Sequence, residues 1–231
     1  MTDHVIPSVS ILAVLHVPLG VLGDTAFTFH GVATTWGEVA AFVTGAWCVW
    51  LVARQHLANW PIGIANSLFF LLLFARYGLY ADGGLQVVYI ALGAYGWWAW
   101  LHGGDCRDAL DVTRTTASEW RILAAATAAA TIALWALLAR VSDSSVPAWD
   151  AVTTALSLAA TWGQCRKKVE SWWLWIAADA VYIPLYAYKS LWLTAGLYVG
   201  FSALCVVGLR SWRADLGARS GGQRATAAAA A

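Results

Sequence analysis

The chain has 231 residues, of which 60% are hydrophobic and only 12% charged, and its formal net charge is +1. This composition is typical of a protein that spans a membrane and excludes an ordinary soluble domain. The basic residues form no patch of the kind that binds nucleic acid.

The first 36 residues contain an apolar stretch at 9–22 that is only 14 residues long and interrupted by Pro18. A spanning helix needs about 20 apolar residues, and this stretch also lacks the basic start and cleavage pattern of a signal peptide. We therefore interpret residues 1–36 as an N-terminal segment with an interfacial or re-entrant helix. An eighth membrane span is the alternative.

Seven apolar segments follow that are long enough to cross a bilayer. They lie at about 37–53, 60–80, 84–101, 119–140, 148–165, 171–189 and 191–212. The last residues, 214–231, include a low-complexity stretch and are expected to form a disordered tail. The sequence thus predicts an all-α membrane protein with seven core transmembrane helices.

The chain also contains an internal repeat. Residues 38–100 align with 150–212 without a gap, and 15 of the 63 positions are identical. The identities include three tryptophan pairs, Trp50 with Trp162, Trp60 with Trp172 and Trp100 with Trp212. This indicates two three-helix repeats, 37–101 and 148–213, joined by residues 102–140 with a single linking helix. Because one helix joins two sets of three, the repeats must be parallel, in a 3+1+3 plan.

The positions of the basic residues predict the orientation. Eleven of the 14 fall on the side that holds the 54–59, 102–118 and 166–170 loops and the C-terminus. Lysine and arginine mark the cytoplasmic face, so we expect a cytoplasmic C-terminus.

The segment 171–189 carries the most informative polar pattern. Trp172, Trp175, Asp179, Tyr182 and Tyr186 are spaced by three or four residues and so share one helix face. An ionised carboxylate near the bilayer midplane costs ~2.5–3.5 kcal/mol, so Asp179 should face a cavity or a partner. Aromatic rings beside one polar anchor suit a flat heteroaromatic ligand. The alternative is a helix–helix contact in which Asp179 accepts a hydrogen bond from a tyrosine or serine.

Further polar and aromatic residues on three other helices are candidates for the remaining walls of such a site. They are Asn66, Gln86, Tyr89, Thr194 and Tyr198. A buried asparagine in lipid also commonly bonds a neighbouring helix, which is the alternative for Asn66.

The sequence contains no catalytic or cofactor-binding pattern. It has no phosphate-binding glycine loop, no H-E-x-x-H, and four scattered cysteines without ligand spacing. We therefore expect no cofactor, no metal and no enzymatic activity.

Several motifs closely resemble the PnuC family of bacterial vitamin transporters. They are W-P-I-G-I-A-N at 60–66, L-Y-A-D at 79–82, L-Q at 85–86, Y-G-W-W-A-W at 95–100, W-x-x-W-x-x-x-D at 172–179 and the run at 185–198. The resemblance implies a 3+1+3 fold like that of SWEET sugar carriers, in the bacterial inner membrane and often as a homotrimer. It also implies facilitated diffusion of a vitamin, with trapping by a cytoplasmic kinase.

The identity of the vitamin stays open at this point. Members that carry nicotinamide riboside tend to have asparagine where this chain has Asp179. A carboxylate suits a cationic pyridinium or thiazolium, and it would equally accept bonds from a flavin or its ribityl chain. The leading hypothesis is transport of nicotinamide riboside or a related vitamin nucleoside. Riboflavin or thiamine transport is the alternative, and a membrane-embedded enzyme or receptor is a remote third.

Overall fold

A computed structural model describes residues 24–29, 31–76, 80–104, 108–141, 146–188 and 192–229. The chain separates into two compact units, residues 1–43 and residues 44–231. The apolar stretch 9–22, for which an interfacial helix and an eighth span were the two interpretations, lies outside the described residues.

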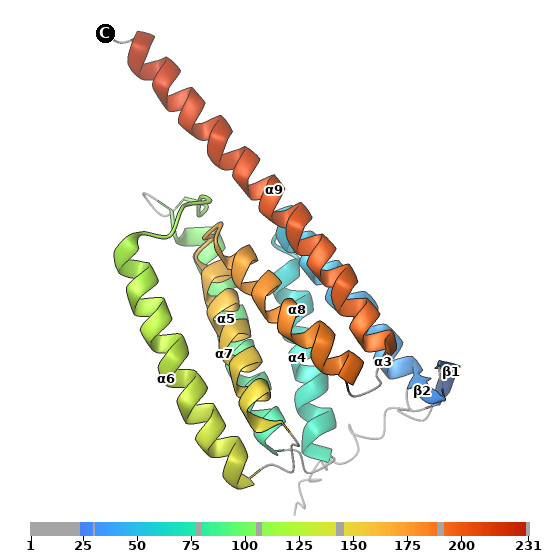
Figure 1. Ribbon diagram of the computed structural model, residues 1–231. Helices are drawn as coiled ribbons and strands as arrows, with labels where there is room; N and C mark the ends of the chain where they lie inside the picture. The colour runs from blue at the N-terminus through green and yellow to red at the C-terminus, as the bar shows by residue number, and fades with distance from the viewer. Residues whose placement is uncertain are drawn as a thin grey trace, which may run out of the picture. The chain divides into compact units, whose positions relative to one another are not determined.

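The described residues hold seven helices, as the sequence predicts (Figure 1). They are α3 (Trp36–Ala53), α4 (Asn59–Arg76), α5 (Tyr80–His102), α6 (Ala117–Val141), α7 (Pro147–Cys165), α8 (Ser171–Tyr188) and α9 (Trp192–Ala229). By length and hydropathy alone, Ala117–Arg140 and Trp192–Arg219 are sufficient to cross a membrane, and Phe42–Ala53 is a shorter apolar helix. The helices match the predicted spans closely, except that α4 ends at Arg76 instead of about 80, α5 begins at Tyr80 instead of about 84, and α9 continues beyond 212.

Two parts of the chain differ from the expectation. Residues 25–35 contain an antiparallel hairpin of β1 (Thr25–Phe29) and β2 (Val32–Thr35), which hydrophobicity alone did not indicate. Its turn contains Gly31 at φ +82°, a conformation that glycine adopts without steric cost. At the other end, α9 continues to Ala229 instead of giving way to a disordered tail at residue 214. The alanines and arginines there have high helix propensity, which the compositional argument did not weigh.

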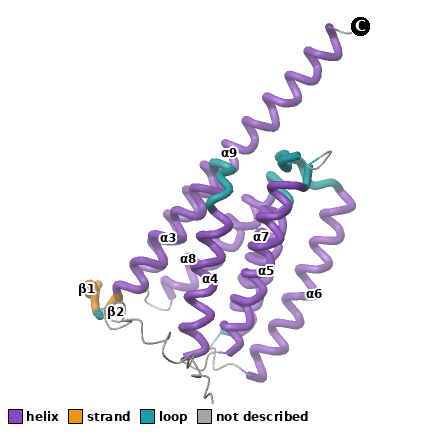
Figure 2. Tube along the Cα trace, turned by 180° about the vertical axis from the view of Figure 1, so that it is seen from behind, coloured by secondary structure: helices purple, strands orange, loops and turns teal. Residues whose placement is uncertain are grey.

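Within residues 44–231, α4 packs along α5, and α8 packs along α9. α7 contacts α5, α6 and α8, so it occupies the middle of this arrangement. Figure 2 shows α5 and α7 side by side, with α6 next to α7.

Four buried tryptophans, here called the tryptophan layer, form the centre of the core. Trp60 packs edge-on against Trp100 at 5.3 Å between ring centroids, and Trp172 packs edge-on against Trp212 at 5.4 Å. The two pairs meet where the Trp100 ring lies against the Trp212 ring, with 6.2 Å between the ring centroids. Because Trp60 aligns with Trp172 in the repeat, and Trp100 with Trp212, the same contact occurs in both copies of the repeated sequence.

The tryptophan layer is also tied together by two indole hydrogen bonds. Trp100 Nε1 donates to the carbonyl of Gln164 at 2.9 Å, and Trp212 Nε1 donates to the carbonyl of Val52 at 3.1 Å. Val52 and Gln164 are also aligned with each other in the repeat, so each bond links one copy of the sequence to the other. These bonds fix the end of α5 to the end of α7, and α9 to the end of α3.

We expect Trp100→Phe and Trp212→Phe to lower the free energy of unfolding by similar amounts. Each removes one indole hydrogen bond, a net loss of about 0.5–1.5 kcal/mol. The acceptor carbonyls keep a backbone donor, the N–H of Lys167 for Gln164 and the N–H of Gln55 for Val52. Thermal unfolding in detergent measures the cost, and Trp192→Phe is the control because Trp192 is 54% exposed. A large cost at only one of the two positions would contradict the equivalence of the two contacts.

A polar bridge lies beside the tryptophan layer, in the loops after α3 and α7. Lys167 Nζ donates to Gln55 Oε1 at 3.1 Å, and Gln55 Nε2 donates to the Asp215 carboxylate. Lys167 also lies 4.5 Å above the Trp100 ring. Burial lowers the pKa of Lys167, the Asp111 and Asp215 carboxylates oppose that shift, and Arg219 adds to it. The bridge thus connects both loops to the extension of α9.

Candidate substrate-binding site

Asp179 is buried in the middle of α8, with 3% of its surface exposed. Its carboxylate accepts a hydrogen bond from Ser202 Oγ at 3.1 Å and a weaker contact from Cys205 Sγ at 3.9 Å, both on α9. This is the serine contact that the sequence left open as an alternative. No basic side chain of the described residues forms an ion pair with Asp179. The carboxylate therefore has hydrogen-bond donors but no counter-charge from the described chain.

Three tyrosines gather one to two turns farther along the same pair of helices. Tyr182 and Tyr186 of α8 stack with centroids 5.7 Å apart. The Tyr198 ring of α9 lies 4.7 Å from Tyr182 and 5.2 Å from Tyr186. Phe201 meets Tyr198 edge-on at 5.8 Å. The packing of α8 against α9 thus places a cluster of tyrosine rings next to the buried Asp179 carboxylate.

A fourth tyrosine approaches from a different helix. Tyr89 of α5 lies close to Ser157 of α7 and in the neighbourhood of Tyr182. Ser157 in turn donates to the Thr153 carbonyl one turn back in its own helix, at 2.8 Å. Tyr89 thus places a side chain of α5 near the tyrosines of α8 and α9.

The two tryptophans of the same face lie apart from this cluster. Trp172 is fully buried, with its ring against the backbone of Gly208 and the ring of Trp212. Trp175 is half-buried and packs against the core cluster that contains the tryptophan layer. The indole N–H groups of both are buried without a hydrogen-bond partner among the described residues. Trp172 thus acts in packing here, and Trp175 keeps a free donor.

The remaining candidates stay unconnected to Asp179. Asn66, Gln86 and Thr194 are half-buried, and within the described part of the chain none makes a polar contact with Asp179 or the tyrosines. No group of three or more histidine, cysteine or acidic side chains that could hold a metal ion is found among the described residues.

Sequence reasoning missed Ser202, Cys205 and Ser157. A signal for the first two was present, because Tyr198, Ser202 and Cys205 are spaced by four and three residues and so share a face of α9. Small polar residues are common in membrane helices, however, and nothing in the sequence distinguishes these from ordinary packing residues.

Comparison with known proteins gives the relationships of the chain. Residues 35–214 match the family model described as nicotinamide mononucleotide transporter. The riboflavin/roseoflavin transporter RibM of Streptomyces davaonensis is 29% identical over 195 residues, which cover 83% of this chain and 91% of RibM. The nicotinamide riboside transporter PnuC of Escherichia coli is 24% identical over 223 residues, covering 86% and 90%.

A solved structure has the same fold. The crystal structure of the vitamin B3 transporter PnuC superposes with a TM-score of 0.59 at 24% sequence identity, and the match covers 77% of this chain and 80% of that one.

Proposed function

The chain belongs to the nicotinamide mononucleotide transporter (PnuC) family, and on this premise we propose that it carries nicotinamide riboside or a closely related vitamin nucleoside across the membrane. The observation that carries the proposal is the buried carboxylate of Asp179, which has no counter-charge among the described residues and lies near stacked tyrosines.

The chemistry of nicotinamide riboside complements this arrangement. Its pyridinium ring is flat and positively charged, so it would offer the counter-charge that Asp179 lacks and a surface on which tyrosine rings stack. The hydroxyls of its ribose would accept hydrogen bonds from groups such as Tyr182 or Tyr198, and one could donate to the Ser202 oxygen, whose own proton goes to Asp179. A buried carboxylate is costly in a membrane unless it is paired, which favours a cationic ligand over a neutral one.

A second candidate is riboflavin. The chain is 29% identical to a riboflavin/roseoflavin transporter, compared with 24% to the nicotinamide riboside transporter of Escherichia coli. A flavin is also flat and aromatic, and its ribityl chain would donate hydrogen bonds to Asp179. The two ligands differ in charge, so the role of the Asp179 carboxylate separates them.

For the mechanism we propose two parallel three-helix halves, α3–α5 and α7–α9, joined by α6. The recurrence of the tryptophan contacts and of both indole bonds at aligned positions of the repeat supports this plan. Rocking of one half against the other would expose the site to each side in turn. Pro184 interrupts the hydrogen bonding inside α8, and a bend there would assist the movement.

We further propose that transport is passive and that the C-terminus lies in the cytoplasm. Asp179 is the sole acidic residue near the midpoint of a predicted span. A proton relay through the membrane uses a chain of several ionisable side chains, so one carboxylate favours passive transport. Phosphorylation of the vitamin in the cytoplasm would then hold it inside and give uptake its direction.

The test is uptake of labelled nicotinamide riboside into liposomes that contain the purified protein. We expect the label to equilibrate without an ion gradient and to be unaffected by a protonophore. Uptake that stops when the proton gradient is collapsed would contradict the passive mechanism, and a chemically altered label inside the vesicles would indicate an enzyme.

A further inference from the structure

A groove of about 500 Å³ lies between α6 and α7 and reaches the start of α8, away from Asp179 and the tyrosines. We call it the α6–α7 groove. Along most of its length its walls are apolar, formed by Leu123, Ala126 and Ala130 of α6 and by Ala155, Leu158 and Ala159 of α7. Thr127 also lines it, but its hydroxyl donates to the Leu123 carbonyl of its own helix at 2.7 Å. The groove therefore offers a hydrocarbon-like interior.

The groove faces the bilayer because α6 has one main neighbour. Among the described helices α6 packs against α7, and its other faces are exposed, with Ile132 64% accessible. The lining residues of α6 run from Glu119 to Ala130, a rise of about 16 Å. Half of a bilayer hydrocarbon core is about 15 Å thick. The groove thus spans the depth of one leaflet, which is the depth of one acyl chain.

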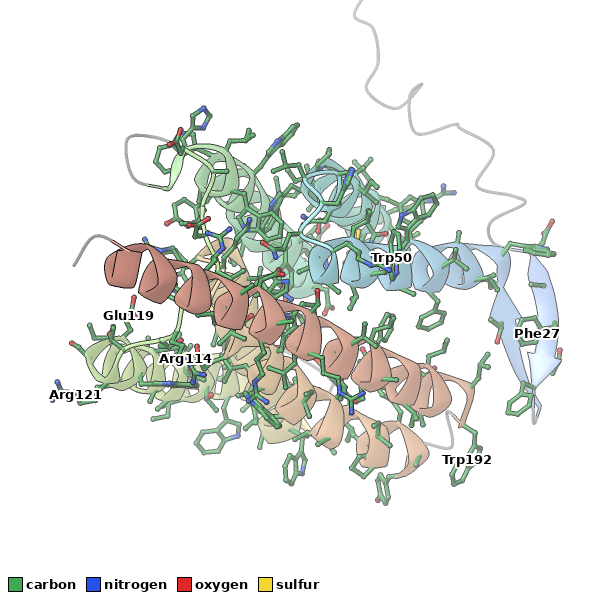
Figure 3. The ribbon with its side chains drawn as sticks, turned by 90° about the horizontal axis from the view of Figure 1, so that it is seen from above. Phe27, Trp50, Arg114, Glu119, Arg121 and Trp192 are labelled. Carbon is green, nitrogen blue, oxygen red and sulfur yellow. The ribbon has the colours of Figure 1, made fainter. Side chains whose placement is uncertain are left out.

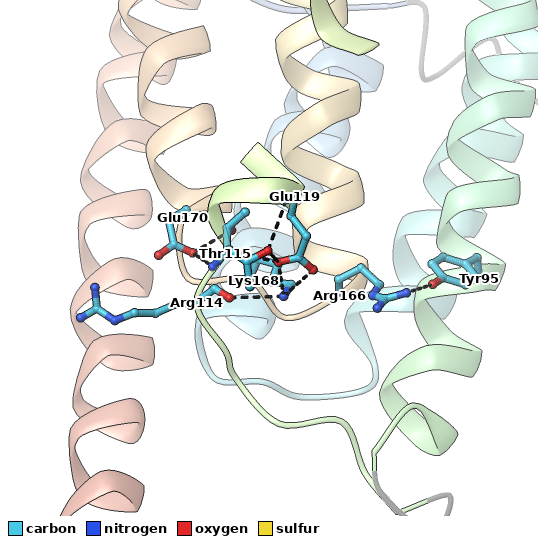
Figure 4. Close-up of polar contacts among 8 residues, drawn as sticks. Tyr95, Arg114, Thr115, Glu119, Arg166, Lys168 and Glu170 are labelled. Carbon is cyan, nitrogen blue, oxygen red and sulfur yellow. Dashed lines mark hydrogen bonds and ion pairs between the residues drawn. The ribbon is translucent and has the colours of Figure 1, made fainter. Parts of the chain in front are cut away.

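One end of the groove is polar, at the level where α6 begins and the α7–α8 loop turns. It is lined by Glu119, Arg166, Lys168 and Glu170. Lys168 pairs with Glu119 at 2.9 Å, and Glu170 accepts bonds from the backbone N–H and hydroxyl of Thr115 at 2.8 and 2.9 Å (Figure 4). Figure 3 labels Glu119 with Arg114 and Arg121 at this end of α6, and the two arginines are not among the residues that line the groove. The charged residues that line this end therefore balance, two basic against two acidic.

Two groups at this end have donor capacity left for a ligand. The guanidinium of Arg166 carries five N–H donors, and among the described residues it donates from Nη1 to the Tyr95 hydroxyl at 3.2 Å. Ser171 lines the groove, is 1% exposed, and its hydroxyl has no hydrogen-bond partner among the described residues. A buried hydroxyl without a partner is unusual, so Ser171 keeps an unused donor at the edge of the groove.

We propose that the α6–α7 groove is a binding site for one glycerophospholipid with a zwitterionic phosphate–ammonium headgroup. One acyl chain lies along the alanines of α6 and α7, and the phosphate accepts hydrogen bonds from Arg166, whose planar fork suits it. The ammonium group lies near Glu170, which matches the balanced charge of the groove's end. Such a lipid fills the space between α6 and α7. The site does not involve the transported vitamin and is independent of its identity.

The experiment reconstitutes the full-length protein in nanodiscs with equal amounts of phosphatidylethanolamine and phosphatidylglycerol, followed by native mass spectrometry after transfer to detergent. We expect one retained phosphatidylethanolamine per chain. Ala126→Trp, which fills the groove, should abolish retention. Ala129→Trp is the matched control, because Ala129 is an exposed α6 residue outside the groove and should leave retention unchanged.

Arg166→Gln keeps the groove open and tests the headgroup separately. We expect it to reduce retention about ten-fold, the effect of losing one charge-assisted contact, while vitamin binding by calorimetry stays as in the unmodified chain. Equal retention in Ala126→Trp and Ala129→Trp would overturn the proposal. Retention without preference between the two lipids would overturn the headgroup assignment, and a changed oligomer mass in Ala126→Trp would show that a second copy of the chain occupies the groove.

Discussion

Replacing Asp179 with alanine is expected to weaken binding of nicotinamide riboside by about 30-fold or more. Removing one partner of a buried, hydrogen-bonded charge pair costs about 2–5 kcal/mol, and every 1.4 kcal/mol is a factor of ten. The change should also leave the Ser202 hydroxyl without its acceptor. Calorimetric titration of the purified protein in detergent measures the loss directly.

Two further variants separate charge from geometry. Asp179→Asn keeps an oxygen that accepts from Ser202 but removes the charge, so it should weaken the cationic riboside more than neutral riboflavin. Ser202→Ala keeps the charge and removes one hydrogen bond, which predicts a smaller loss of roughly ten-fold or less. An unchanged ranking of the ligands in Asp179→Asn would show that Asp179 does not read ligand charge.

Gly208→Ala is expected to lower the thermal stability of the protein strongly. A Cβ at Gly208 would lie 2.4 Å from the Trp172 ring, a distance at which the ring must move. Trp172 is fully buried and packed against Trp212, so no space is available for that movement. Overpacking of this kind costs about 1–3 kcal/mol or more. Gly96→Ala should act alike, because its Cβ would lie 2.2 Å from the Trp60 ring.

The matched control lies in the same helix. Gly200 of α9 has no atom within 4 Å of the position its Cβ would take, so Gly200→Ala should keep or raise stability through the higher helix propensity of alanine. The measurement is the unfolding temperature in detergent, followed by tryptophan fluorescence. Equal unfolding temperatures for Gly208→Ala and Gly200→Ala would contradict the described packing of the tryptophan layer.

The helices were predictable because membrane spans have a strong and simple signal. Long apolar runs locate all seven described helices. The hairpin at residues 25–35 has no such signal, since its strands are short and mix polar with apolar residues. The continuation of α9 to Ala229 depends on helix propensity, which hydropathy does not detect.

The candidate site was predictable only in part, because sharing a helix face is not the same as sharing a site. Trp172 and Tyr186 lie on one face of α8 but near its opposite ends, separated by a rise of about 21 Å along the axis. Trp172 therefore belongs to the tryptophan layer, whereas Tyr186 stacks with Tyr182 and Tyr198. Asp179 lies between them, and its contact with Ser202 depends on how α8 and α9 pack, which the sequence does not specify.

The most direct test of the central claim is a calorimetric titration of the purified full-length protein with nicotinamide riboside, riboflavin and thiamine. Our account predicts saturable binding of nicotinamide riboside that is tighter than that of the other two and is lost in Asp179→Ala. If the protein instead binds riboflavin alone, and Asp179→Asn does not weaken that binding, our account is contradicted and the transported vitamin is a neutral flavin.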